Sequence, residues 1–245
     1  RELLAAGKIG HIGLSTHNPE VALLACDEPE IEVIMFSLNP AFDMMPASED
    51  LEDLFGDYEN VAGDGIEPTR ARLYARAEER ETALTVMKGY AGGRLLSADA
   101  SPFGVALTPV QCIHYALTRP AVASVMVGVE TVEQLEEALA YERATAAERD
   151  YASVLAGAPK HAYMGQCTYC GHCAPCTVGI NIALSNKFAD LAEMAGEVPA
   201  SVAAHYEAMD VTAGACIACG DCEPRCPFDV PIIERMEAAE KLFGC

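Results

Sequence analysis

The chain has 245 residues, of which 51% are apolar, and a formal net charge of −21 at neutral pH. This excess of carboxylates repels nucleic-acid phosphates and anionic lipid surfaces, so we expect neutral or basic partners and no nucleic acid. No apolar stretch approaches the roughly 20 residues that cross a bilayer, so we expect no membrane span.

The first residues predict the end of an amphipathic helix that Gly7 closes. A natural protein rarely begins inside a helix, and the first residue is Arg1 rather than Met. We therefore expect that further residues precede Arg1 in the natural protein.

Short apolar runs alternate with helical patterns through residues 1–158, which we expect to form the first domain. Four of these runs predict strands, at residues 9–14, 31–38, 83–88 and 121–128. A capping side chain or a proline marks the expected start of a helix after each strand, at Asn18, Glu67, Thr108 and Thr131. Four successive strand–helix units predict an α/β fold with parallel strands. They could form half of an eight-stranded barrel of the TIM type or a small open sheet.

Eight of the eleven cysteines lie in two compact runs within residues 159–245, the expected second domain. The first run is Cys167, Cys170, Cys173 and Cys176, and the second is Cys216, Cys219, Cys222 and Cys226. Three thiolates at this spacing can bind one iron–sulfur cube, and in two-cluster ferredoxins the displaced fourth cysteine ligates the other cube. The sequence therefore predicts two 4Fe-4S clusters with crossed ligation. One would take Cys167, Cys170, Cys173 and Cys226, and the second Cys216, Cys219, Cys222 and Cys176.

Zinc is the main alternative, because paired cysteines also build tetrahedral sulfur sites. Zinc sites usually use two pairs with a spacer, which leaves the third and fourth cysteine of each run without a role. A disulfide framework suits small secreted chains rather than this one, and the cysteine runs favour a reducing cytoplasm. His172 lies inside the first run, and we interpret it as a neighbour of the site rather than a ligand. Cys26 and Cys112 are expected to be small buried hydrophobes.

The segment between the cysteine runs has helical spacing, with Leu184, Phe188, Leu191 and Met194 on one face. A second helix is expected to begin near Ser201, and a third to follow the second run. We therefore expect an all-α ferredoxin domain.

Four segments outside the cysteine runs resemble a known family. GKIGHIGLSTHNPE, EVIMFSLN, MKGYAGGRLL and SVMVGVETVEQLEEAL together are similar to strands 5–8 of an aldo/keto reductase barrel. The cysteine-rich part is similar to the alpha-helical ferredoxin module that one bacterial branch of that family carries. The resemblance implies an iron–sulfur oxidoreductase, present here without the half of the barrel that carries the catalytic residues.

The resemblance also implies a nicotinamide cofactor, NAD(P), at the ends of the strands. In that family the turn after the fifth strand lies near the nicotinamide amide, and this chain has Ser15 there, with Thr16 in place of an Asn. The glycines that correspond to the loop near the pyrophosphate are Gly92 and Gly93, and Gly128 belongs to the phosphate-binding turn.

Other positions depart from the family pattern. Met35 replaces a Gln near the nicotinamide, and Lys88 replaces the Tyr that stacks on it. The cations that hold a 2′-phosphate are missing, and Glu130, Glu133 and Gln134 stand in that turn. Two carboxylates would repel this phosphate, so we expect NADP to bind poorly. Whether the turn holds NAD or only caps a helix stays open.

The chain contains none of the family's catalytic Asp, Tyr, Lys and His motifs, so we assign no catalytic residue. His17 and Tyr90 lie in strand-end loops, but neither matches the family's general acid. The expected partners are a small-molecule substrate or a redox partner protein. Three functions stay open. The clusters could carry electrons to or from a reductase site, they could be structural or redox-sensing, or the segment could be an electron-transfer binding module rather than an enzyme.

Overall fold

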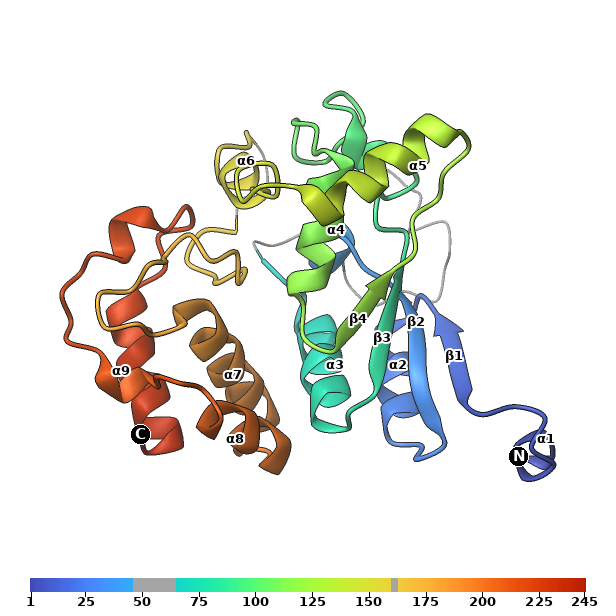
Figure 1. Cartoon of the computed structure of the whole chain (residues 1–245), viewed down its shortest axis with the longest axis horizontal. Helices are drawn as coiled ribbons and strands as arrows, with labels where there is room; N and C mark the ends of the chain where they lie inside the picture. The colour runs from blue at the N-terminus through green and yellow to red at the C-terminus, as the bar shows by residue number, and fades with distance from the viewer. Residues whose placement is uncertain (46–64, 160–162) are drawn as a thin grey trace.

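The computed structural model describes residues 1–45, 65–159 and 163–245 and contains a parallel sheet beside a group of helices (Figure 1). The sheet has four strands in the order β1-β2-β3-β4, and all three neighbouring pairs are parallel. The strands are β1 (Ile12–Thr16), β2 (Ile31–Ser37), β3 (Ala83–Met87) and β4 (Val122–Val125). This arrangement confirms the expected α/β organisation with parallel strands. It is an open sheet, and the described residues do not show half of a barrel.

Two strands differ in extent from their predicted ranges. Residues 9–11 do not join β1, because the partner strand β2 begins only at Ile31, which pairs with Ile12. β4 ends at Val125, before the predicted end at residue 128, because its partner β3 ends at Met87. One further hydrogen bond, from Met126 N to Val86 O, completes the ladder between the two strands. Strand ends depend on the neighbouring strand, which an apolar run by itself does not specify.

Local caps fix the starts of the helices that follow the strands. The helices are α2 (Pro19–Cys26), α3 (Pro68–Glu79), α4 (Pro109–Thr118) and α5 (Val132–Leu139). Asn18 Oδ1 accepts a hydrogen bond from Glu20 N at 2.8 Å, and the Glu67 carboxylate accepts one from Thr69 N at 2.9 Å. Thr108 and Gln111 form a complete capping box. These helices begin where the sequence predicts them to, because a cap involves only neighbouring residues.

The two faces of the sheet differ in burial. Ile34, Phe36, Leu84 and Val86 are fully buried on the face against which α2, α3 and α4 pack. Residues on the opposite face remain partly exposed, and there Thr85 Oγ1 lies 3.0 Å from Ser124 Oγ. β1 approaches β2 closely at Gly13, where a Cβ atom would lie 2.9 Å from the carbonyl oxygen of Val33.

The C-terminal part of the chain is helical, as expected. Its helices are α7 (Ile182–Ala195), α8 (Ala200–Glu207) and α9 (Ile232–Phe243). α6 (Ala152–Ala156) lies between this group and the sheet unit, and α1 (Glu2–Ala5) precedes β1. The described residues also contain short 3-10 turns, namely η1 (Phe42–Met44), η4 (Arg94–Leu96), η5 (Ala140–Arg143), η6 (Ala213–Ala215) and η7 (Glu223–Arg225).

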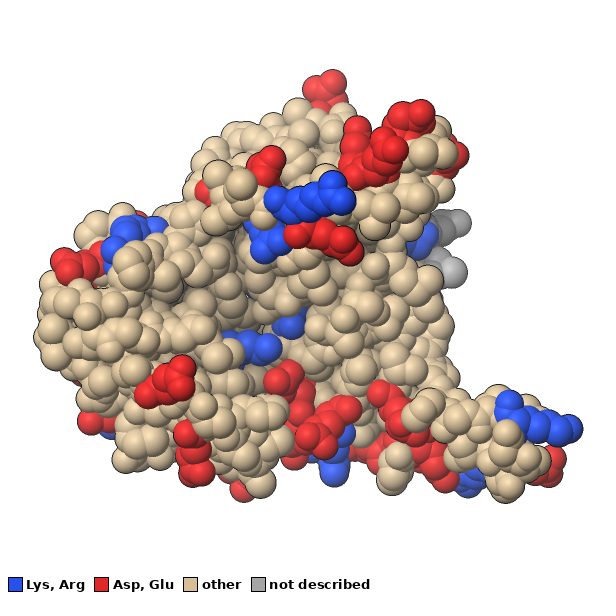
Figure 2. Space-filling view, viewed as in Figure 1, with Lys and Arg blue, Asp and Glu red and all other residues tan. Residues whose placement is uncertain are grey.

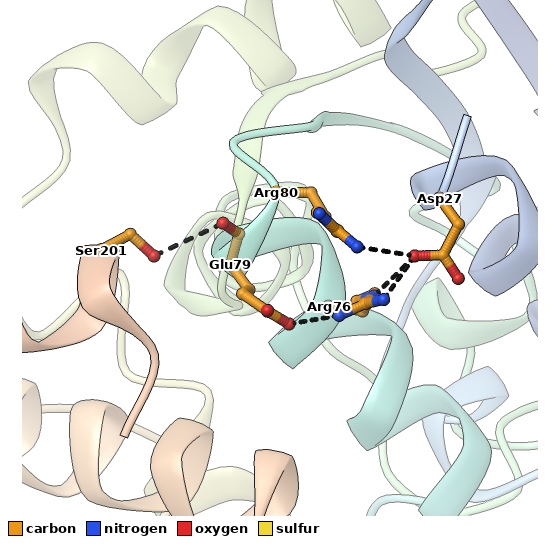
Figure 3. Close-up of polar contacts among 5 residues, drawn as sticks. All are labelled: Asp27, Arg76, Glu79, Arg80 and Ser201. Atoms are coloured by element: carbon orange, nitrogen blue, oxygen red, sulfur yellow. Dashed lines mark hydrogen bonds and ion pairs between the residues drawn. The ribbon is translucent and has the colours of Figure 1, made fainter. Parts of the chain in front are cut away.

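Helix α3 connects the sheet unit with the helical group, because it packs against α2 on one side and against α7 and α8 on the other. Figure 3 shows the polar contacts at its C-terminal end. Arg76 Nε donates to Asp27 Oδ1 at 2.9 Å, and Arg76 Nη1 donates to Glu79 at 2.7 Å. Arg80 donates to the same Asp27 oxygen at 3.3 Å, and the Ser201 hydroxyl donates to the Glu79 carbonyl at 3.4 Å.

Acidic side chains dominate the surface. On the face drawn in Figure 2 they gather over α5 at the upper edge and along the lower edge of the molecule. Across the described ranges, the helices are all too short or too polar to cross a membrane.

Candidate metal centre

The two cysteine runs have the same backbone conformation around their second cysteine. In each run the residue before the second cysteine has a positive φ, 57° at Tyr169 and 50° at Ala218. The glycine after that cysteine also has a positive φ, 81° at Gly171 and 80° at Gly220. Non-glycine residues in this region are strained and persist where the surrounding structure holds them, often at functional sites. The repeated geometry indicates that both runs use their cysteines in the same way.

The first run surrounds a cavity, here called the first cavity, which also receives one cysteine of the second run. Its cysteines are Cys167, Cys170, Cys173 and Cys226. The other lining residues are mostly apolar or small, namely Thr168, Gly171, His172, Ala183, Asn186, Phe228, Val230 and Ile232. Cys176, the last cysteine of the first run, does not line it.

The second cavity repeats this pattern in reverse. Its cysteines are Cys216, Cys219, Cys222 and Cys176. The exchange follows from the path of the chain. After Cys176 the backbone turns at Gly179, with φ 86°, and enters α7. After Cys226 it turns at Asp229, with φ 52°, and enters α9. Each fourth cysteine therefore leaves its own run and lies beside the other.

Residues of each run also contact the other run. Arg225 Nη2 donates to the carbonyl oxygens of Cys173 and Pro175, both at 2.8 Å. The Thr177 hydroxyl donates to Asp221 Oδ2 at 3.1 Å. Because these contacts cross between the runs, they hold the two cysteine loops at a fixed separation.

The chemistry of the cavity walls fits an anionic sulfur cluster. Among the described residues, Arg225 Nε is a buried donor without a hydrogen-bond partner, and Arg225 lines the second cavity. A buried donor without a partner costs about 1–3 kcal/mol. Hydrogen bonds to sulfur are among the features that adjust iron–sulfur centres, so the cluster sulfurs are natural acceptors for such donors.

The arrangement of the cysteines suits a cluster better than a single zinc ion. Zinc takes four ligand atoms around one point, with sulfur at about 2.3 Å, whereas a cube takes one thiolate at each of four irons. Within residues 1–45, 65–159 and 163–245, no group of three or more His, Cys, Asp or Glu side chains is placed to hold one ion.

The two cavities differ in their access to solvent. Burial raises the pKa of the Cys167 thiol to about 12 and that of the Cys173 thiol to about 11. These thiols therefore lose protons when they bind metal. In the second cavity Cys219 is exposed, and the neighbouring Ile217 is 60% exposed. The cysteines of the first cavity are thus partly buried, whereas the second cavity includes one exposed cysteine, Cys219.

The remaining cysteines and His172 occupy ordinary positions. Cys26 and Cys112 are buried, which confirms that they are small core residues, and burial raises their pKa to about 11 and about 12. His172 Nε2 lies 3.0 Å from Asp150 Oδ2, so its ring is oriented by a carboxylate outside the cysteine runs.

The residues that the reductase resemblance implies lie at the C-terminal ends of the strands. Ser15 and Thr16 end β1, and the Thr16 hydroxyl accepts a hydrogen bond from Asn18 N at 3.1 Å. Gly92 and Gly93 follow β3 with φ values of 67° and 88°, and Gly128 lies between β4 and α5. The structure brings these residues to one edge of the sheet without defining a binding site there.

The start of α5 does not fit a phosphate. Thr131 Oγ1 accepts from Gln134 N at 3.3 Å, and Gln134 Oε1 accepts from Glu130 N at 2.7 Å. These bonds form most of a capping box and use amides that a phosphate would need. The carboxylate of Glu133 stands in the same turn. The observed contacts favour a helix cap at this position.

A buried polar network leads from the sheet to the first cysteine run, and the sequence analysis did not predict it. Asp43 is fully buried and accepts hydrogen bonds from the hydroxyls of Tyr74 and, at 2.6 Å, Tyr115. Arg119 and Tyr151 both donate to the carbonyl oxygen of Thr168, with the Tyr151 bond at 2.6 Å. These residues are distant in the sequence, so no local pattern marks them; the only signal is a set of polar residues in otherwise apolar segments.

The comparison with protein families agrees with the geometry of the cysteine loops. Residues 166–231, about a quarter of the chain, match the family model of the 4Fe-4S dicluster domain. This part of the chain is therefore a ferredoxin-type iron–sulfur domain. A domain of this class suggests an electron-transfer function. Neither a curated protein nor a solved structure matches the chain.

Proposed function

We propose that this chain is the C-terminal part of an iron–sulfur oxidoreductase of the aldo/keto reductase type, in which two 4Fe-4S clusters carry electrons. The first cluster would be held by Cys167, Cys170, Cys173 and Cys226, and the second by Cys216, Cys219, Cys222 and Cys176. The observation that carries the proposal is the pair of cavities, each lined by three cysteines of one run and one of the other.

The mostly apolar lining of the first cavity supports a redox role, because solvent exclusion helps to set the potential of a cluster. The surface position of the second cavity supports electron exchange with a redox partner there. Each cluster, when bound, moves one electron at a time. The protein contributes the thiolates, the buried Nε donor of Arg225, and the fixed separation of the two loops.

Two features of the sheet support the reductase part of the proposal. The strands follow one another in chain order, as they do in a barrel, and in the described part of the chain β1 and β4 each pair with one strand only. The partly exposed sheet face carries Met35, Thr85 and Ser124, and a second set of strands could enclose it. Because the start of α5 does not fit a phosphate, we derive no nicotinamide step.

Reading the gene upstream of Arg1 tests the reductase part. Four further strand–helix units that carry an Asp, a Tyr, a Lys and a His would support a complete barrel enzyme. A start codon directly upstream of the Arg1 codon would leave an electron carrier without a reductase site.

Crossed ligation can be tested with pairs of cysteine variants. Cys226→Ser should remove the same cluster as Cys170→Ser, so the double variant should retain as much iron as either single variant. Cys226→Ser combined with Cys219→Ser should remove both clusters and nearly all iron. Iron and sulfide analysis after anaerobic purification measures these losses, and Cys245→Ser, at an exposed position, is the matched control. Additive losses of iron in the double variant Cys226→Ser with Cys170→Ser would show that each run binds its own cluster.

A further inference from the structure

Arg119, directly after α4, is a buried cation. Its side chain is 1% exposed, and among the described residues no carboxylate lies within ion-pair distance of it. Its Nε and Nη1 atoms are buried and have no hydrogen-bond partner. A guanidinium stays protonated in proteins, so this position holds a full positive charge.

The contacts of Arg119 direct this charge toward the first cavity. Its Nη2 donates to the carbonyl oxygen of Thr168, which lines that cavity beside Cys167, and to Thr118 Oγ1 at 3.1 Å. The guanidinium lies over the ring of Tyr115, 4.5 Å from its centroid, and over the ring of Tyr169 at 5.0 Å. None of its contact residues lines the second cavity.

These contacts do not neutralise the charge. The free-energy cost of burying an unpaired ion exceeds what a cation–π contact returns, even when that contact is desolvated. Asp43 is a candidate counterion, but its carboxylate accepts hydrogen bonds from Tyr74 and Tyr115, and the Tyr115 side chain contacts both Asp43 and Arg119. Burial also raises the pKa of Asp43, although Arg119 and Arg70 oppose this shift. Among the described residues, the positive charge of Arg119 is therefore not paired directly with a carboxylate.

We propose that Arg119 provides the counter-charge of the first cluster and raises its reduction potential. Four thiolates make a bound cluster a net anion, and reduction adds one more negative charge. A fixed cation in a medium of low dielectric constant stabilises the reduced form more than the oxidised form. Arg119 is thus a positioning residue that acts through charge. The inference rests on the proposed ligation of the first cluster.

Redox titration followed by electron paramagnetic resonance tests this role in the anaerobically purified full chain. Arg119→Gln and Arg119→Met should lower the potential of one cluster, and Arg119→Lys should keep it near the wild-type value. In a Cys219→Ser background, where only the first cluster remains, the same downward shift should persist. Arg70→Met is the matched control. Arg70 is equally buried, but it donates to the carbonyls of Ser37 and Met45 and has no contact with the cysteine runs.

Iron content separates the possible outcomes. Wild-type protein without iron would overturn the proposed function itself. Full iron content with unchanged potentials in Arg119→Gln and Arg119→Met would overturn only the role of Arg119. Loss of the first cluster from both neutral variants, with retention in Arg119→Lys, would also support a charge role. Loss from all three variants would show that the shape of the arginine is what matters, and would contradict the proposal.

Discussion

The hydroxyl groups of the buried tyrosines have unequal surroundings. Tyr115 donates to Asp43 and also lies 3.4 Å from the Tyr163 hydroxyl, whereas the buried hydroxyl of Tyr90 has no partner. When a buried carboxyl loses a hydrogen-bond donor, its desolvation cost is no longer offset and the fold is destabilised. A buried hydroxyl without a partner makes no hydrogen bond that could be lost. The two residues thus form a natural pair for measuring what the Asp43 network contributes to stability.

We expect Tyr115→Phe to lower the free energy of unfolding by about 2 kcal/mol, because Asp43 would lose one of its two tyrosine donors. Tyr90→Phe should leave it unchanged or raise it slightly, because the substitution removes a polar atom that is already unpaired. Anaerobic urea unfolding followed by circular dichroism measures both changes. Equal effects of the two substitutions would contradict the importance assigned to the Tyr115–Asp43 bond.

At the scale of the elements, the cysteine loops contain strained backbone, and the binding of a cluster would offset the free-energy cost of this strain. Ala218 has φ 50° and is exposed, so its side chain adds little packing to offset the strain. A non-glycine residue in this conformation costs roughly 1–2 kcal/mol. The same conformation at Tyr169 is accompanied by a hydrogen bond from its hydroxyl to Asp190 at 2.7 Å, which helps to hold the first loop.

Ala218→Gly should therefore raise the free energy of unfolding by roughly 0.5–1 kcal/mol, since glycine adopts a positive φ without a steric penalty. Ala204→Gly, at an exposed position within α8, is the control and should lower it by about 1 kcal/mol. Thermal unfolding under anaerobic conditions compares the two variants. A destabilising Ala218→Gly would mean that the alanine side chain has a role that the structure does not show.

Elements with local signals were predictable, and those that depend on distant partners were not. The starts of α2, α3 and α4 followed from Asn18, Glu67 and Thr108, because a cap and its helix are neighbours in the sequence. The ends of β1 and β4 were misjudged, because pairing with another strand determines them. The helical character of residues 182–195 followed from a periodic apolar face that packs against α9.

The same distinction applies to the candidate site. The eight cysteines could be read from the sequence because their spacing is local, and the family model confirms an iron–sulfur domain. The role proposed for Arg119 could not be predicted from the sequence, because its partners Thr168 and Tyr169 lie about 50 residues further along the chain. Only the fold brings this cation close to the first cavity.

At the scale of the whole molecule, the two cavities are placed asymmetrically. The first cavity lies toward the sheet unit, whose Arg119 and Tyr151 contact the carbonyl of Thr168. The second cavity is at the surface, next to the exposed Cys219. In the proposed function, an electron from a partner protein would reach the second cluster first and the sheet unit last. The charge of −21 favours a basic partner in this exchange.

The central claim is that the eight cysteines of the two runs hold two 4Fe-4S clusters. The most direct test is metal and acid-labile sulfide analysis of the anaerobically purified chain. We predict about eight irons and about eight sulfides per chain, with negligible zinc. Iron near zero, with one or two zinc ions per chain, would contradict the account.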